Sequence, residues 1–191
     1  MYVNIKEAGR LNFSSCFGCT QNCCDGSRIS LSPLILEDFE EVYKHFAIMF
    51  VKIDSEIKPV IVLNNGMNPC KYNIDGKCSI YEERAPACKI YPMSPYIDGS
   101  MYVDTSCPAV GGEGEFLCDE NGFSDKYYHK RIENITAKLK TTFEMMEHLK
   151  GGLVKECYVK EMPLYKYVGD FDNEFIKMHK ESLRHLDCDT N

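Results

Sequence analysis

The cysteines between residues 16 and 24 could bind a metal ion. They stand in the stretch Cys16-Phe-Gly-Cys19-Thr-Gln-Asn-Cys23-Cys24. Two cysteines separated by two residues can hold one ion, because the turn between them brings both sulfurs within bonding distance. Zinc takes four such ligands, and iron–sulfur clusters use similar short spacings. Neighbouring side chains of an extended segment point to opposite faces, so either Cys23 or Cys24 would serve a second metal or bridge within a multinuclear site.

A second cysteine cluster extends from Cys70 to Cys78. Between them lies the dipeptide Asp75-Gly76, which is typical of a tight turn. We therefore expect the chain to reverse there and to return Cys78 towards Cys70, as in the hairpins on which metal knuckles are often built. Cys88 and Cys107 follow further along the chain, each close to a proline.

Eight cysteines in all fall into four clumps, which is enough for two four-ligand sites, or for one site with supporting thiols. Soft thiolates select zinc or iron–sulfur over magnesium or calcium. A structural zinc that holds a loop-rich segment together and a 4Fe-4S cluster both fit, and inert or disulfide-bonded thiols are the third alternative. The predicted metal ligands are Cys16, Cys19, Cys23, Cys24, Cys70, Cys78, Cys88 and Cys107.

The remaining three cysteines and the five histidines are not expected to bind the metal. Cys118, Cys157 and Cys188 stand alone, and we expect them to be packed or exposed thiols that need not pair. The histidines show no ligand spacing. His179 and His185 are six residues apart, which places them poorly on one face of a helix.

Composition restricts the class of protein. The chain has 191 residues, 22 of them basic and 29 acidic, for a net charge of −7, whereas a general nucleic-acid binder is expected to be basic. No tract approaches the roughly 18 apolar residues of a membrane span. The first residues lack the basic and apolar runs of a signal peptide. We therefore expect a cytoplasmic protein with reduced thiols, bound to neither nucleic acid nor membrane.

Three helices are expected from the spacing of apolar residues. The first covers residues 32–49, with Ser32 as the N-cap and a proline at the first helical position. The second runs over residues 124–150 and is stopped by Gly151-Gly152. The third covers residues 172–186.

Short strands are expected at residues 60–63 and 101–103, and another near residues 28–31, where β-branched and aromatic residues lie between turn signals. The predicted fold class is α+β, with an irregular, loop-rich cysteine half packed on α-helices and few short strands. We expect residues 1–122 to form the cysteine-rich metal-binding region. Residues 123–191 would form a helical region of the same compact unit, which supports the centre or presents it to a protein partner.

The stretch Cys78–Pro92 resembles the second motif of the YkgJ-type family of zinc- or iron-chelating cysteine-cluster proteins, described by the signature CxxCxxCC. The resemblance extends over residues 13–112 and implies a chelated zinc or iron. At its front the sequence departs from the family, because three residues rather than two separate Cys19 from Cys23. That difference affects the ligand geometry predicted for the cysteine doublet.

Two basic residues within this motif are candidates for binding the cofactor. Arg84 and Lys89 could donate hydrogen bonds to thiolates or carbonyl groups and so orient the centre. The alternative is an ordinary surface pair. The motif departs from the family at Ala85, where proline is expected and Pro86 follows one place later, and at Lys89, where arginine is usual.

A second resemblance concerns catalysis. The stretches Cys23-Cys24-Asp-Gly, Tyr91-Pro92 and Ser106-Cys107-Pro108 are similar to the cysteine-rich region of flagellin lysine N-methylases. The resemblance implies an iron–sulfur cluster, but this chain is too short for the rest of those enzymes. The first hypothesis is therefore a metal-binding protein without catalysis of its own. The alternative is an iron–sulfur enzyme or enzyme component, for a modification like lysine methylation or for electron transfer. No catalytic acid, base or cofactor loop is evident, which favours the first.

Overall fold

The computed structural model of the chain has two compact units, and each is built from two stretches of sequence. Unit 1 comprises Met1–Asn22 and Pro86–Lys138, and unit 2 comprises Cys23–Ala85 and Leu139–Asn191. The described residues are 1–14, 23–24, 26, 29–95, 100–125 and 130–188. No helix within these ranges is both long and apolar enough to cross a membrane. The expected division of the chain after residue 122 stays a prediction.

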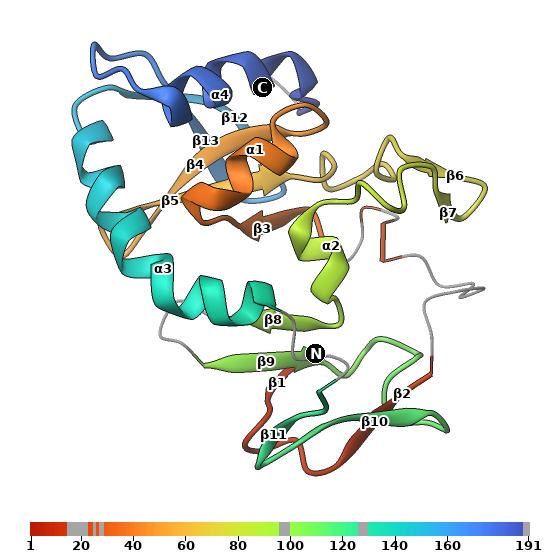
Figure 1. Cartoon of the computed structure of the whole chain (residues 1–191). Helices are drawn as coiled ribbons and strands as arrows, with labels where there is room; N and C mark the ends of the chain where they lie inside the picture. The colour runs from red at the N-terminus through yellow and green to blue at the C-terminus, as the bar shows by residue number, and fades with distance from the viewer. Residues whose placement is uncertain (15–22, 25, 27–28, 96–99, 126–129, 189–191) are drawn as a thin grey trace. The chain divides into compact units, whose positions relative to one another are not determined.

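A five-stranded antiparallel sheet with the order β12-β13-β4-β5-β3 is the main element of unit 2 (Figure 1). Two hairpins, β4–β5 and β12–β13, supply four of its strands. The strands are β3 (Leu31–Pro33), β4 (Ala47–Ile53), β5 (Glu56–Val62), β12 (Leu153–Val159) and β13 (Met162–Tyr167).

Two short helices, α1 (Phe39–Val42) and α4 (Glu174–Ser182), pack against β4. The ring of Phe39 meets the ring of Phe175 edge-on, with 5.8 Å between their centroids. A 3-10 turn, Leu36–Asp38, precedes α1, and another, Leu183–His185, follows α4. The two helices therefore cover one face of this strand with a shared apolar contact.

Strand β4 is buried on both of its faces. Residues Ala47–Val51 are all buried, so the strand reads as a continuous apolar run rather than an alternating one. It turns into β5 through Asp54 and Ser55, which have φ angles of 51° and 68°. Two positive φ angles are typical of the type I′ turn, whose twist matches that of the flanking strands.

A buried histidine joins the two hairpins. Strands β13 and β4 are paired at Tyr165 and Phe50. Two residues further along each strand, Nδ1 of His179 lies 2.7 Å from the carbonyl oxygen of Ile48, and the backbone N–H of Tyr167 donates to Nε2 at 3.1 Å. An N–H group can only donate, so Nε2 is the acceptor and Nδ1 carries the proton. The fully buried imidazole thus replaces a strand-to-strand hydrogen bond between β4 and β13.

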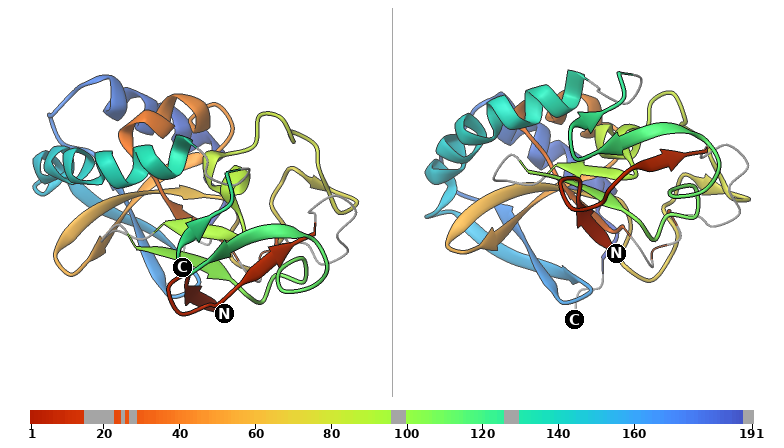
Figure 2. Two further views of the ribbon diagram at one scale, coloured as in Figure 1. Left: turned by 60° about the horizontal axis from the view of Figure 1, so that its bottom comes forward. Right: turned by 90° about the horizontal axis from the view of Figure 1, so that it is seen from below.

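Two three-stranded sheets form unit 1, with the orders β1-β9-β8 and β11-β10-β2. Figure 2 shows β2, in red, beside its antiparallel partner β10, in green. The helices are α2 (Pro86–Ile90) and the first part of α3 (Lys130–Met146). The strands are β1 (Tyr2–Asn4), β2 (Leu11–Phe13), β8 (Met93–Pro95), β9 (Met101–Asp104), β10 (Glu115–Asp119) and β11 (Gly122–Phe123). Their apolar core is centred on Phe13, Met93, Val103, Leu117 and Cys118.

The predicted fold class is wrong in its balance of strands and helices. Within the described residues four sheets carry the structure, whereas the helices other than α3 are short. The expectation of a loop-rich half packed on helices with few short strands fails for a physical reason. Many of these strands have only two to four residues, which is too short for an alternating pattern to be recognised.

The predicted helix over residues 32–49 is the clearest local error. Helical structure there is limited to the 3-10 turn Leu36–Asp38 and to α1, and β4 begins at Ala47. The expected apolar residues are buried, but a strand buried on both faces gives the same continuous apolar pattern as a helix.

The other predicted helices are confirmed. The helix expected over residues 124–150 corresponds to α3, which begins at Lys130, and to the 3-10 turn Glu147–Leu149; residues 126–129 lie outside the described part. The helix expected over residues 172–186 corresponds to α4 and its following turn. The strand expected at residues 60–63 corresponds to the end of β5, which stops at Val62, and the one at residues 101–103 lies in β9. The strand expected near residues 28–31 begins at Leu31, as β3, and residues 27 and 28 lie outside the described part.

Candidate metal centre

A short hairpin brings two of the predicted ligands together in unit 2. Strands β6 (Asn73–Ile74) and β7 (Lys77–Cys78) are joined by Asp75 and Gly76, with φ angles of 49° and 77°. These angles again fit a type I′ turn. The turn predicted from the sequence is therefore confirmed, and the charge of Cys78 is close enough to influence the thiol of Cys70.

A third predicted ligand reaches the same place from a distant part of the chain. The backbone N–H of Cys70 donates to the carbonyl oxygen of Cys24 at 2.7 Å. Two residues after Cys24, Gly26 has a φ of 86°, and a Cβ on it would lie 2.4 Å from the carbonyl oxygen of Asn68. The close approach of the two segments thus depends on a position without a side chain.

Two buried asparagines hold the segment that leads from β5 to Cys70. The Asn65 Oδ1 atom accepts hydrogen bonds from the backbone N–H groups of Met67, at 3.0 Å, and Asn68, at 2.7 Å. The Asn64 Nδ2 atom donates to the carbonyl oxygen of Ile29 at 2.8 Å. Both side chains satisfy backbone groups that no strand or helix pairs, so they fix the path by which the chain enters the cysteine hairpin.

Residues that follow Cys70 attach this hairpin to the rest of unit 2. The Tyr72 hydroxyl donates to the carbonyl oxygen of His45 at 3.2 Å, and its ring meets the Phe46 ring edge-on at 5.2 Å. The Nζ atom of Lys71 lies 3.2 Å from Nδ1 of His185, in the turn after α4. Burial is the main reason that the pKa values of Lys71 and His185 are both lowered. The base of the hairpin is therefore held from two sides.

The donor chemistry of this part of unit 2 suits a thiophilic cation. Burial raises the pKa of Cys70, and the charge of Cys78 raises it further, against a hydrogen bond from the backbone of Tyr72. A bound cation would oppose both effects, since the thiolate is the form that binds metal. Across the hairpin from Cys78, the Oδ1 atom of Asn73 is buried and accepts no hydrogen bond within the described residues.

The described residues do not form a complete metal site by themselves. Among the described residues, no group of three or more histidine, cysteine, aspartate or glutamate side chains is arranged so that it could hold a metal ion. The predicted ligands Cys16 and Cys19 lie outside those residues. Cys23 is half-buried beside Cys24. The structure thus brings the backbone of Cys24 to the hairpin of Cys70 and Cys78 and leaves the full ligand set as a prediction.

The other two predicted ligands belong to unit 1. Cys88 is half-buried on α2, and Cys107 is buried in the apolar core. The backbone N–H of Cys107 donates to the carbonyl oxygen of Asp104 at 3.1 Å. Burial alone would raise the pKa of Asp104, but hydrogen bonds from Ser106, the Met1 amino group and Tyr91 together lower it. An ionised carboxylate therefore fixes the loop that carries Cys107.

The candidate cofactor-binding residues lie one in each unit. The Arg84 guanidinium stacks on the ring of Tyr81, with 3.9 Å from Cζ to the ring centroid. Lys89 lies near the end of α2 and is half-buried. The contact with Tyr81 gives Arg84 a packing role, and the predicted orientation of the centre by Arg84 and Lys89 stays a prediction.

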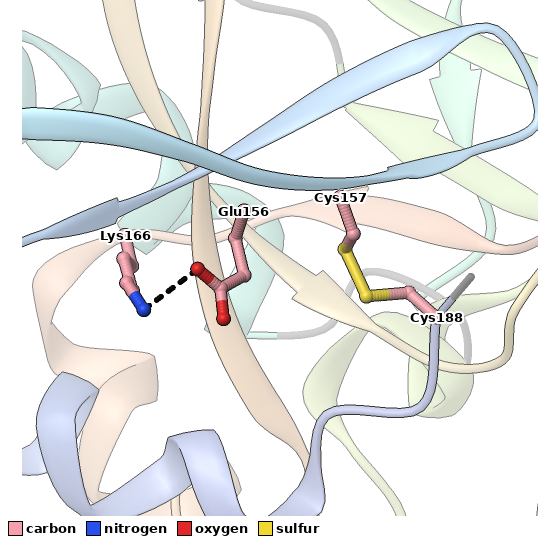
Figure 3. Close-up of a disulfide and its surroundings, with 4 residues drawn as sticks. All are labelled: Glu156, Cys157, Lys166 and Cys188. Carbon is pink, nitrogen blue, oxygen red and sulfur yellow. Dashed lines mark ion pairs between the residues drawn. A yellow bond between two sulfur atoms is a disulfide. The ribbon is translucent and has the colours of Figure 1, made fainter. Parts of the chain in front are cut away.

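Cys157 and Cys188 form a disulfide, so the expectation that these two cysteines carry thiols is wrong. Figure 3 shows Cys157 next to Glu156 on β12, where Glu156 pairs with Lys166 at 2.7 Å. The two cysteines are 31 residues apart, and nothing in their spacing indicates the pairing. Cys118 is fully buried in the core of unit 1, in agreement with the expected packed thiol.

The residues that support the hairpin were not predicted from the sequence. Asn64 and Asn65 belong to an Asn-Asn-Gly stretch, which is a turn signal that could have been noticed. Tyr72 was not singled out from the sequence, and His45 was expected on a helix. No local pattern indicates that His45 accepts the hydrogen bond of Tyr72.

The chain matches a protein-family model over most of its length. A family model described as "Putative zinc- or iron-chelating domain", with the signature CxxCxxCC, matches residues 15–146, more than two thirds of the chain. No curated protein and no solved structure matches the chain. The resemblance to flagellin lysine N-methylases finds no support in these comparisons.

Proposed function

Because the chain belongs to the CxxCxxCC family of zinc- or iron-chelating domains, we propose that it binds zinc or iron through thiolates that include Cys24, Cys70 and Cys78. The observation that carries this proposal is the meeting of the Cys24 segment with the hairpin of Cys70 and Cys78. The Asp75-Gly76 turn returns Cys78 to Cys70, and the Cys24 carbonyl group accepts the Cys70 N–H at 2.7 Å. Thiolates from separate segments are the donors that zinc and iron–sulfur centres take.

The proposed role is that of a metal-binding protein without catalysis of its own. Five further cysteines stay candidate ligands, for this site or for a second one: Cys16, Cys19, Cys23, Cys88 and Cys107. We also propose a cytoplasmic setting, since seven of the nine described cysteines carry thiols and a reducing compartment preserves such ligands. When bound, the metal would supply the positive charge that keeps buried thiols in their thiolate form.

Purification without oxygen, followed by measurement of zinc, iron and acid-labile sulfide, tests the proposal and identifies the metal. We expect stoichiometric metal in the full chain. A colourless protein with zinc would identify a zinc site, whereas a brown protein with matching iron and sulfide would identify an iron–sulfur cluster and favour the enzyme or electron-transfer alternative. Wild-type protein that holds neither zinc nor iron would contradict the proposal.

A pair of substitutions tests the ligand assignment. Cys78→Ser should lower the metal content, because an alcohol is a much weaker ligand than a thiolate for these soft metals. Cys118→Ala is the matched control, since it removes a buried thiol in the core of unit 1 that is outside the ligand set. If both variants keep the wild-type metal content, Cys78 is not a ligand.

A further inference from the structure

The segment Leu183–Cys188, called here the C-terminal segment, follows α4 and is tied to the sheet of unit 2. Leu183, Leu186 and Cys188 pack against an apolar cluster formed by the two hairpins. The disulfide joins Cys188 to Cys157, which is buried on β12 (Figure 3). The disulfide therefore fixes the end of this segment, after the 3-10 turn, to strand β12.

The same segment contacts the cysteine hairpin. The Nδ1 atom of His185 lies 3.2 Å from Nζ of Lys71, which directly follows Cys70. Asp187 is close enough for its charge to act on Lys71 as well. Two residues of the C-terminal segment therefore interact with the neighbour of a predicted metal ligand.

A disulfide is unusual in a chain whose other described cysteines carry thiols. In a compartment that keeps those thiols reduced, a disulfide is usually transient and redox-sensing rather than structural. The disulfide is not fully buried either. Cys157 is 2% exposed, but Cys188 is only half-buried. Cys188 is thus the more accessible of the two cysteines.

We propose that the Cys157–Cys188 disulfide is a redox switch that sets metal affinity, because it holds the C-terminal segment against Lys71 and so keeps Cys70 in its position. This inference rests on the proposed function. The reductant is a dithiol: one thiolate attacks the Cys188 sulfur, the Cys157 thiolate leaves and takes up a proton, and the second thiol of the reductant then releases Cys188 as a thiol. Two electrons pass to the protein, and the reductant ends as a disulfide.

Loss of the restraint should weaken metal binding rather than abolish it. The thiols of Cys24, Cys70 and Cys78 are untouched by the exchange, whereas the support of Lys71 by His185 is lost. Loss of a group that orients a metal ligand typically lowers affinity about 10- to 100-fold. We therefore expect zinc affinity at least about tenfold lower in the reduced protein.

The test measures zinc affinity of the full-length protein by competition with a chelator, before and after reduction of the disulfide by a phosphine. The phosphine becomes its oxide with oxygen from water, and it adds no competing thiol. Alkylation followed by mass measurement counts the thiols in each sample. Equal zinc affinity in the two states would overturn the switch, whereas failure of the oxidised protein to bind zinc or iron at all would overturn the proposed function instead.

Two variants separate the restraint from the bond itself. Cys188→Ser cannot form the disulfide and should show the weaker affinity whether or not the phosphine is present. His185→Ala keeps both cysteines but removes the contact with Lys71, so it should bind zinc weakly even with the disulfide intact. Cys118→Ala is the control and should respond to reduction as the wild type does. Wild-type affinity in oxidised His185→Ala would overturn the proposed route from the disulfide to Cys70.

Discussion

Acidification from pH 7 to pH 5 should destabilise the protein, because His179 is buried as a neutral imidazole. Its pKa is lowered from 6.5 to about 4, chiefly by burial, against the hydrogen bond to Ile48 and with a further contribution from the charge of Lys180. In the unfolded chain the imidazole regains its ordinary pKa, so the unfolded state binds the proton first as the pH falls. Stability is therefore fully present above pH 6.5 and is lost progressively as the pH falls towards 4.

The size of the effect follows from the two pKa values. Because the unfolded chain binds the proton more tightly, the free energy of unfolding should fall by about 2 kcal/mol between pH 7 and pH 5. The fall should reach about 3 kcal/mol once the pH lies below both pKa values. No discount for solvent screening applies, since His179 is fully buried. Protonation would also place a proton on Nε2, which the N–H of Tyr167 occupies at 3.1 Å. The loss is thus concentrated at the junction between β4 and β13.

Urea unfolding at pH 7 and pH 5, followed by circular dichroism, measures this loss in the wild type and in His179→Gln. The glutamine amide can donate to Ile48 and accept from Tyr167 but does not titrate in this range. The variant should be less stable at pH 7, and its stability should fall by about 2 kcal/mol less than that of the wild type on acidification. The same pH dependence in both proteins would refute the assignment to His179.

Two further predictions concern the supports of the cysteine hairpin. Gly26→Ala should lower the free energy of unfolding by about 2 kcal/mol or more and should weaken metal binding. The added Cβ would lie 2.4 Å from the Asn68 carbonyl oxygen, and residue 26 has a φ of 86°, which an alanine rarely adopts. Gly112→Ala is its control in urea unfolding, with no heavy atom within 4 Å of the added carbon, and equal effects of the two substitutions would contradict the argument. Tyr72→Phe should cost about 1 kcal/mol through the lost hydrogen bond to His45, as measured by urea unfolding, and an unchanged stability would show that this bond does not hold the hairpin.

The parts of the fold that could be predicted have a pattern that distinguishes helix from strand. The helices corresponding to α3 and α4 were recognised because polar residues interrupt their apolar spacing, and Gly151-Gly152 also marked the end of the first of them. Strand β4 could not be recognised in the same way. Burial on both faces removes the alternation, and its turn at Asp54-Ser55 contains no glycine. The sequence is locally ambiguous there, and only pairing with β5 and β13 decides the structure.

The predicted part of the metal centre is the part that is local in sequence. Asp75-Gly76 marks the reversal between Cys70 and Cys78, and a type I′ turn is a property of those two residues. The approach of Cys24 to Cys70 has no comparable signal, since it depends on the absence of a side chain at Gly26 and on the path set by Asn65. The Cys157–Cys188 bond likewise depends on the packing of the C-terminal segment against the sheet.

Ligands and supports should therefore respond differently to substitution. The cysteine spacing indicates which atoms donate to the metal. The supports come from distant parts of the chain: His45 holds Tyr72 from 27 positions away, and His185 holds Lys71 from 114 positions away. Removing a thiolate at Cys78 takes away a donor, so the amount of metal bound should fall. Removing a support leaves every donor present but less well ordered, and ordering it then costs part of the binding free energy. Substitution of a supporting residue should thus lower the affinity for zinc but leave the number of zinc ions bound unchanged. A titration with zinc measures both quantities and so distinguishes a support from a ligand.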